Sequence, residues 1–135
     1  MSYKLLDHAT DAIVEVTASD LKEAFLVVAE AVIDITLSRD SVREKEERRF
    51  SAQGKDLSYL LFNWLEELVF VMITDGFAIR RVSLELGESS IDAIAYGEPL
   101  DLGRHGFKVE IKAPTFHDME IRTKDTVYMR FLLDL

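Results

Sequence analysis

The 135-residue chain is acidic and of a size that suits one globular domain. It carries 16 Lys and Arg against 25 Asp and Glu, a formal net charge of −9 at pH 7, and 48% of its residues are hydrophobic. This composition is typical of folded, soluble proteins and excludes a disordered chain. Because binding to a phosphate backbone depends on Lys and Arg, we expect no strong direct binding to nucleic acid. We expect a single domain over residues 1–135.

The chain contains no cysteine, which excludes disulfides, thiolate zinc sites and a cysteine nucleophile. Its first residues lack the apolar segment of a signal peptide. The longest uninterrupted apolar run, 68–73, is too short to cross a bilayer. We therefore expect a cytoplasmic protein with no membrane partner.

Apolar residues at alternating spacings of four and three predict two amphipathic helices. The first is expected from about Asp20 to Leu37, and either Ser19 or Asp20 can cap its N-terminus. The second is expected to begin after Asp56, a second capping residue, and to end at Gly76, which can adopt the left-handed conformation.

The rest of the chain is dominated by apolar residues that alternate with polar ones, the pattern of half-buried antiparallel strands. Glycines and a proline between Gly97 and Gly106 predict a long loop, and 112–117 is expected to follow a strand. The predicted fold class is therefore α+β, with two amphipathic helices packed on a mainly antiparallel sheet. Strands are expected at residues 13–17, 44–53, 82–86, 91–96, 107–111, 118–123 and 127–134.

Acidic side chains are concentrated at both ends of the chain. Asp7, His8 and Asp11 lie within five residues, and the last strand is followed by Asp134 and the α-carboxylate of Leu135. Clustered carboxylates repel one another unless they are protonated or bind a cation. Oxygen ligands suit Mg²⁺, Mn²⁺ or Ca²⁺, and an imidazole favours Mn²⁺ or Zn²⁺. The two groups meet only if the N-terminal strand lies beside the C-terminal one; otherwise they are a capped turn and a solvated carboxylate.

Five segments stand out in order along the chain: Asp7-His8-Ala9-Thr10-Asp11; a Leu-rich helix around Trp64; Gly97-Glu98 with His105; Glu110-Ile111-Lys112-Ala113-Pro114-Thr115-Phe116-His117; and Asp134-Leu135. Taken together and in this order, they resemble the archease family over essentially the whole chain. The chain departs from the family pattern at two places: the middle residues of the first segment are exchanged, since archeases have Asp-His-Thr-Ala-Asp, and Phe116 replaces a tyrosine.

The resemblance implies a fold of two nested strand-helix-strand-strand units, and an accessory role rather than an enzymatic one. Archeases activate the RtcB-type RNA ligase of tRNA splicing by promoting GTP-dependent guanylylation of the ligase and multiple turnover. By motif, Asp11, Asp134 and the Leu135 carboxylate would bind a divalent metal ion, Ca²⁺, Mg²⁺ or Mn²⁺. Asp7 and His8 would flank this site, while Lys112 would supply a compensating charge or contact the ligase or its nucleotide.

Two other functions remain open from the sequence. The first is a metal-independent interaction module or chaperone for RNA-modifying proteins, which would bind partners regardless of EDTA and of Asp134. The second is a free-standing metal-dependent phosphohydrolase, which would turn over a phosphoester without a ligase.

Overall fold

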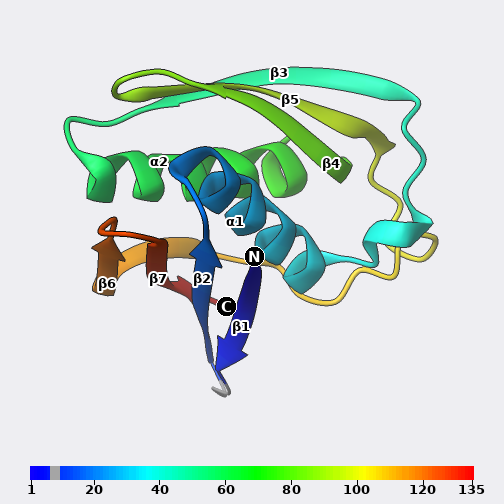
Figure 1. The fold of residues 1–135 in the computed structure, drawn as a ribbon. Helices are drawn as coiled ribbons and strands as arrows, with labels where there is room; N and C mark the ends of the chain where they lie inside the picture. Colours follow the sequence, from blue (N-terminus) through cyan, green and yellow to red (C-terminus); the bar gives the residue numbers. More distant parts are fainter. Residues whose placement is uncertain (7–9) are drawn as a thin grey trace.

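The computed structural model describes residues 1–6 and 10–135, in which two α-helices lie between two antiparallel sheets (Figure 1). The predicted α+β class is confirmed, although the expected single sheet is two sheets. The elements in chain order are β1 (Ser2–Leu6), β2 (Asp11–Ala18), α1 (Leu21–Thr36), η1 (Arg39–Ser41), β3 (Glu46–Gln53), α2 (Leu57–Val69), η2 (Phe70–Thr74), β4 (Phe77–Leu86), β5 (Ser90–Pro99), β6 (Ala113–Arg122) and β7 (Val127–Asp134).

The sheets are nested in the sequence. One has the strand order β3-β5-β4 and the other the order β1-β2-β7-β6. The unit β3–α2–β4–β5 is therefore inserted into a second unit, β2–α1–β6–β7, between its helix and its last two strands. Each unit is a strand, a helix and two strands, so the expected nested pair is confirmed.

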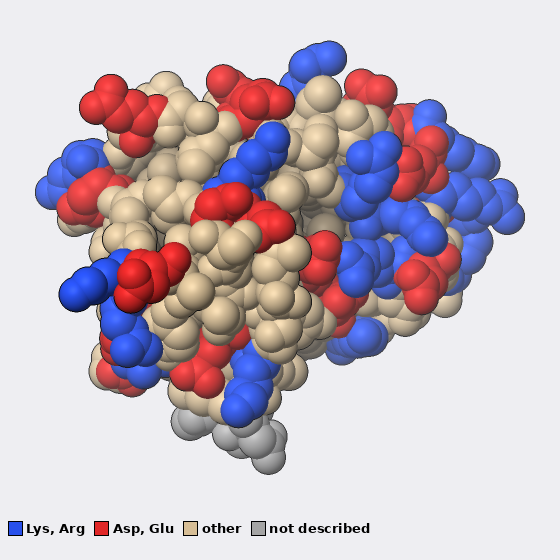
Figure 2. All heavy atoms as spheres, viewed as in Figure 1, with Lys and Arg blue, Asp and Glu red and all other residues tan. Residues whose placement is uncertain are grey.

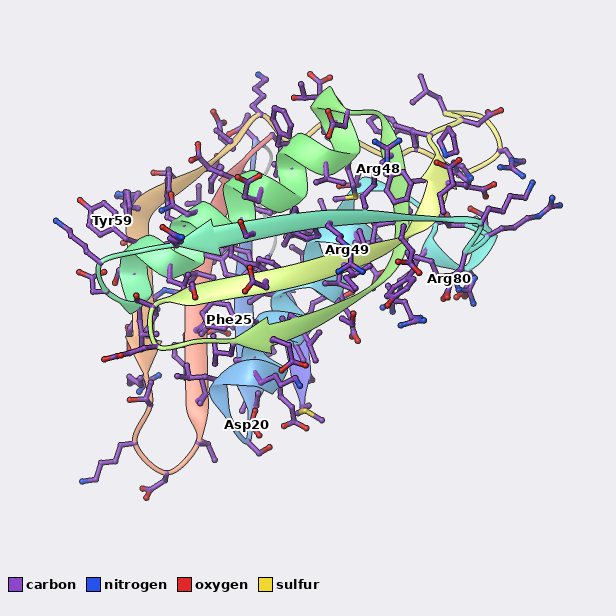
Figure 3. The ribbon with its side chains drawn as sticks, turned by 90° about the horizontal axis from the view of Figure 1, so that it is seen from above. Asp20, Phe25, Arg48, Arg49, Tyr59 and Arg80 are labelled. Carbon is purple, nitrogen blue, oxygen red and sulfur yellow. The ribbon has the colours of Figure 1, made fainter. Side chains whose placement is uncertain are left out.

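The core lies between the layers, and Figure 3 views it from the side of the three-stranded sheet. Trp64 of α2 is fully buried, stacks on Phe50 of β3 with ring centroids 5.3 Å apart, and donates from Nε1 to the carbonyl of Phe25 at 3.0 Å. These contacts show that Trp64 has a packing role in the core. The segment Leu57–Thr74 is long and apolar enough to cross a membrane by length and composition, but here it lies between the sheets as a core helix.

Both helices begin at the aspartates that the sequence indicated. The Asp20 side chain accepts from the backbone N–H of Glu23 at 2.9 Å, and Asp56 accepts from Tyr59 at the same distance. Of the two candidates for the first cap, Asp20 is therefore the N-cap. The second helix continues through the π-helical turn η2 and stops at Gly76, whose φ is +61°.

The segment 97–112 corrects one strand prediction and one loop prediction. Residues 107–111 form no strand; their alternation arises because the chain runs along the end of α1, where Lys108 N–H donates to the Thr36 carbonyl at 2.8 Å. Residues 97–99 belong to β5 rather than to the loop.

β6 begins at Ala113, whereas the sequence predicted a start at 118. The start was missed because the alternation of apolar and polar residues is broken within the strand. Thr115 pairs with Leu132 but Glu120 pairs with Arg130, so β6 bulges, and Asp118 within the bulge has a φ of +57°. A period-two pattern cannot continue through such a bulge.

Candidate functional site

Asp11 and Asp134 lie directly opposite each other, as Cα partners in the β2–β7 pairing. Directly opposed residues of antiparallel strands project to the same face of the sheet, with Cβ atoms about 4.5–5.5 Å apart. Neither carboxylate forms an ion pair with any residue of 1–6 or 10–135. The strands are thus neighbours, as the metal-site hypothesis required, and two adjacent negative charges lie there without an ion pair to any described residue.

Leu135 and Lys112 reach the same end of the sheet through their backbones. The Leu135 N–H donates to the Thr10 carbonyl at 3.1 Å, and the Lys112 N–H donates to the Asp134 carbonyl at 2.8 Å. The exposed Lys112 lines a small hollow of about 150 Å³ together with Glu66 and Phe70 near the end of α2. Asp7 and His8 lie outside the described residues, so their flanking role stays a prediction.

The donor chemistry of this cluster suits a hard divalent cation. Asp11, Asp134 and the Leu135 carboxylate offer oxygen ligands, and Mg²⁺ is commonly held by one or two carboxylates with water and substrate phosphates completing the shell. Within the described residues, no group of three or more His, Asp or Glu side chains could hold a metal ion. The cluster therefore fits a cation whose other ligands come from water or a partner, and the three ligands and the metal stay predictions.

A hollow of about 650 Å³, here called the β1 hollow, adjoins this cluster and is lined in part by Asp11 and Leu135. Three polar residues of its lining, Tyr3, Asp34 and Lys108, were not predicted from the sequence. Tyr3 donates from its hydroxyl to Asp34 at 2.8 Å, and Lys108 donates to the Asp34 carbonyl at 2.9 Å. Burial and the Asp34 carboxylate raise the pKa of Tyr3 to about 12, so the tyrosine remains a hydrogen-bond donor at neutral pH.

One feature of the sequence could have drawn attention to Asp34. It is an acidic residue in the last turn of α1, where the helix dipole disfavours negative charge. The structure compensates it with Tyr3 and with Arg39, whose Nε lies 3.2 Å from the other carboxylate oxygen.

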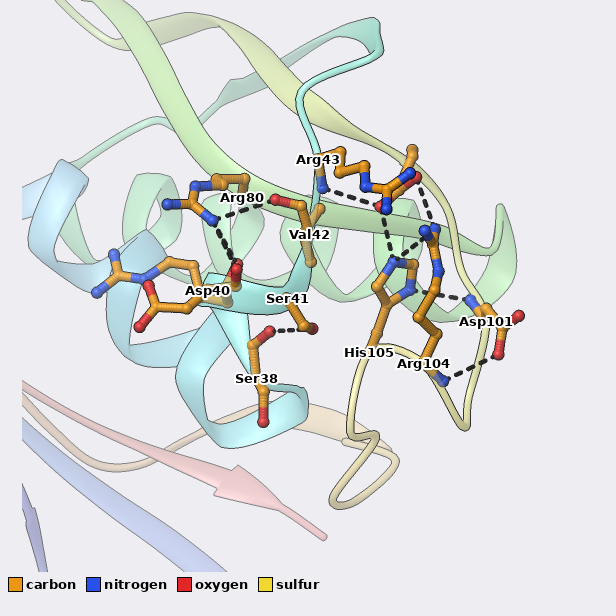
Figure 4. Close-up of polar contacts among 11 residues, drawn as sticks. Ser38, Asp40, Ser41, Val42, Arg43, Arg80, Asp101, Arg104 and His105 are labelled. Atoms are coloured by element: carbon orange, nitrogen blue, oxygen red, sulfur yellow. Dashed lines mark hydrogen bonds and ion pairs between the residues drawn. The ribbon is translucent and has the colours of Figure 1, made fainter.

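A second polar cluster centres on Glu98, which is only 2% exposed (Figure 4). The Arg43 N–H donates to Glu98 Oε2 at 2.8 Å, Arg104 Nη2 lies 2.7 Å from Oε1, and His105 Nε2 lies 2.9 Å from Oε2. The Asp101 N–H donates to His105 Nδ1 at 3.0 Å, so the imidazole proton lies on Nε2 and is donated to Glu98. These donors, led by the Arg43 amide, lower the pKa of Glu98 to about 2.

The Glu98 cluster is structural rather than chemical. It joins the residues before β3 to the loop after β5, and no buried side-chain nitrogen or oxygen among the described residues lacks a partner. Arg80 makes a parallel link from the β4 bulge, donating to the Asp40 carbonyl of η1 at 2.9 Å. The family motif that contains Gly97, Glu98 and His105 is thus explained by packing.

Comparison with known proteins places this geometry in a family. Residues 3–135 match the family model described as "Archease protein family (MTH1598/TM1083)". The chain belongs to the archease family. The membership expected from the five motif segments is confirmed.

Relatives named as archeases align over most of their length. "Protein archease" of Pyrobaculum islandicum is 36% identical, covering 100% of this chain and 96% of that protein. The protein of the same name from Pyrococcus abyssi is 39% identical over 85% of this chain and 84% of its own. "Protein archease-like" of Drosophila melanogaster is 32% identical over 90% and 80%.

Two solved structures share the fold. The solution structure of Methanobacterium thermoautotrophicum protein 1598 has a TM-score of 0.79 and 30% identity, covering 99% of both chains. A Thermotoga maritima crystal structure, described as an archease and possible chaperone, has a TM-score of 0.59 over 98% of this chain and 96% of that one. At 17% identity the latter supports the fold alone.

Proposed function

We propose that the chain is a cytoplasmic, non-catalytic activator of an RtcB-type RNA ligase in tRNA splicing, promoting GTP-dependent guanylylation and repeated turnover of the ligase. The observation that carries the proposal is the directly opposed pair Asp11 and Asp134 beside Leu135, which forms no ion pair with any described residue. Family membership supports the proposal, because residues 3–135 match the family for which the resemblance implied ligase activation.

In this proposal, Asp11, Asp134 and the Leu135 carboxylate hold a Mg²⁺, Mn²⁺ or Ca²⁺ ion at one end of the four-stranded sheet. A bound metal ion neutralises charge that develops on phosphoryl groups. The two aspartates are held in place relative to each other because β2 and β7 are the two central strands of that sheet. Asp7 and His8 flank the site, and Lys112 meets the ligase or its nucleotide.

The charge distribution supports an approach of this end to a basic partner. Lys and Arg side chains gather where η1, the start of β3 and the loop after β5 meet (Figure 2). Half of the chain's 16 Lys and Arg lie at positions 39–49, 80–81 and 104, although the net charge is −9. The remaining surface, which includes the carboxylate pair, is therefore strongly acidic and would steer association electrostatically.

Guanylylation of an RtcB-type ligase tests the proposal. Labelling with radioactive GTP and Mn²⁺ is measured with substoichiometric amounts of the protein, and repeated ligation is followed in parallel. Asp11→Ala and Asp134→Ala should each lower the stimulation at least about tenfold, because each removes a metal ligand. Glu88→Ala, an exposed carboxylate between β4 and β5, is the matched control and should stimulate fully. Full stimulation by both aspartate variants would overturn the metal-site mechanism.

The second candidate is a metal-independent interaction module or chaperone, favoured because no group of three or more His, Asp or Glu side chains among the described residues could hold a metal ion. It predicts that partner binding persists in EDTA and in Asp134→Ala, and that guanylylation does not respond to the protein. The same experiment therefore separates the two functions.

A further inference from the structure

Electrostatic repulsion acts on the β2–β7 pairing at the end where Asp11 faces Asp134. These two residues are the outermost Cα partners at that end, and neither forms an ion pair with any residue of 1–6 or 10–135. Like charges directly opposite each other destabilise a strand pair. The last residues of a domain are also poorly ordered unless other contacts hold them. The end of β7 therefore needs a contact that keeps Asp134 beside Asp11.

Leu135 makes such a contact on the other face of the sheet. Successive residues of a strand point to opposite faces, and along β7 Leu133 is fully buried, Asp134 is exposed and Leu135 is again partly buried against the core. The Leu135 side chain lines the β1 hollow together with Ile35 of α1. Its N–H donates to the Thr10 carbonyl at 3.1 Å, which extends the strand pairing one residue past the aspartates. Apolar packing on one face thus opposes the repulsion on the other.

Backbone hydrogen bonds also hold Asp134, but they lie at the end of the sheet. Ala113 of β6 is the Cα partner of Asp134, and the Lys112 N–H donates to the Asp134 carbonyl at 2.8 Å. Backbone hydrogen bonds close to solvent, with few apolar contacts around them, open at a small cost in free energy. Leu135 is the apolar side chain that follows the carboxylate pair on this strand, so its packing decides how often this end opens.

We propose that the Leu135 side chain is a positioning group, whose packing in the β1 hollow holds Asp134 beside Asp11 in the arrangement that binds the divalent cation. Without this packing both carboxylates are still present, but the cation has to order them as it binds. Groups that orient metal ligands without touching the metal commonly contribute about ten- to a hundredfold to metal affinity. This inference rests on the proposed function, because it concerns the same metal cluster.

The affinity for Mn²⁺, measured by calorimetric titration of the full chain, tests this role. Leu135→Ala keeps both aspartates and the α-carboxylate, and it should bind Mn²⁺ about tenfold more weakly than the native protein. Leu135→Met keeps an apolar side chain of similar volume and should bind within about twofold of the native protein. Leu5→Ala is the matched control and should bind like the native protein, because Leu5 lines the same hollow from β1 but lies outside the β2–β7 pairing.

Hydrogen exchange of the metal-free proteins measures the positioning directly. Because the Lys112 amide donates to the Asp134 carbonyl, its exchange rate reports how often the end of β7 opens. This amide should exchange about tenfold faster in Leu135→Ala than in the native protein or in Leu5→Ala. The melting temperatures of the two alanine variants should stay close to each other, since each loses one leucine that is only partly covered. A role in overall stability alone would change the melting temperature of Leu135→Ala and leave its Mn²⁺ affinity unaltered.

The outcomes separate this inference from the proposed function. Native Mn²⁺ affinity in Leu135→Ala, or equal weakening in Leu5→Ala, would overturn the positioning role and leave the metal cluster and the activator role standing. A native protein that binds no Mn²⁺ would overturn the metal cluster and this inference with it. A native protein that binds Mn²⁺ and shows the Leu135 effects, but does not stimulate the ligase, would support the positioning role and overturn the proposed function alone.

Discussion

The buried carboxylate of Glu98 is contacted by three donor groups. Glu98 receives the Arg43 amide, the His105 imidazole and the Arg104 guanidinium, which stabilise its charged form and lower its pKa from 4.5 to about 2. Since the folded state holds the carboxylate ionised more strongly than the unfolded state does, this contribution to stability is present above about pH 4.5. It is lost progressively as the pH falls through the interval down to about 2.

We therefore expect Glu98→Gln to lower the free energy of unfolding at pH 7, with a difference from the native protein that shrinks as the pH falls from about 4.5 towards 2. Urea denaturation over this range measures it. Glu44→Gln is the control, because Glu44 pairs with Arg81 at 2.9 Å on the surface, where ion pairs contribute little. A pH-independent loss in Glu98→Gln would contradict the assignment of charge to this cluster.

Gly97 is required by the close approach of two strands. A Cβ built at Gly97 would lie 1.8 Å from the Ala78 carbonyl oxygen of β4 and 3.2 Å from Phe77, near the β4 bulge. Because backbone cannot give way as a flexible side chain does, Gly97→Ala should destabilise the protein by about 3 kcal/mol or prevent folding. Thermal unfolding checks this, with Gly103→Ala, where the nearest atom is 3.8 Å away, expected to melt like the native protein.

At the scale of the elements, helix starts were predictable because they are decided locally. A short oxygen-bearing side chain followed by a period near 3.6 marks Asp20 and Asp56, and both act as N-caps. The strand predicted at 107–111 was wrong because a chain lying on a helix end also produces alternating burial. The strand predicted at 118–123 exists as part of β6, but its start was missed because the bulge erases the alternation.

The cap of α1 gives a direct test of this local control. Asp20→Ala removes the acceptor of the Glu23 amide and should cost about 1 kcal/mol of stability. Asp20→Ser keeps an acceptor oxygen and should recover most of the loss. Denaturant midpoints of the three proteins measure it, and equal midpoints for Asp20→Ala and the native protein would exclude a capping role.

At the scale of the whole molecule, the sequence predicted the identity of the site residues well, but it predicted poorly how the fold brings these residues together. Asp11 and Asp134 were recognised from their residue types and family motifs, but their meeting depended on β2 pairing with β7. Tyr3, Asp34 and Lys108 were missed because they converge from β1, α1 and an irregular loop. The division into two sheets was also missed, since strand alternation shows which face is buried and says nothing about which strand is the neighbour.

The nested order of the two units has a consequence for how the chain folds. The inserted unit is continuous from β3 to β5, so its strands can pair while later residues are still being synthesised. The four-stranded sheet cannot, because β7, the last of the strands in chain order, lies between β2 and β6. Until β7 docks, the edge of β2 that faces away from β1 has no strand to pair with. The joining of Asp11 to Asp134 is thus among the final events of folding, and the acidic pair forms only in a molecule whose sheet is already closed.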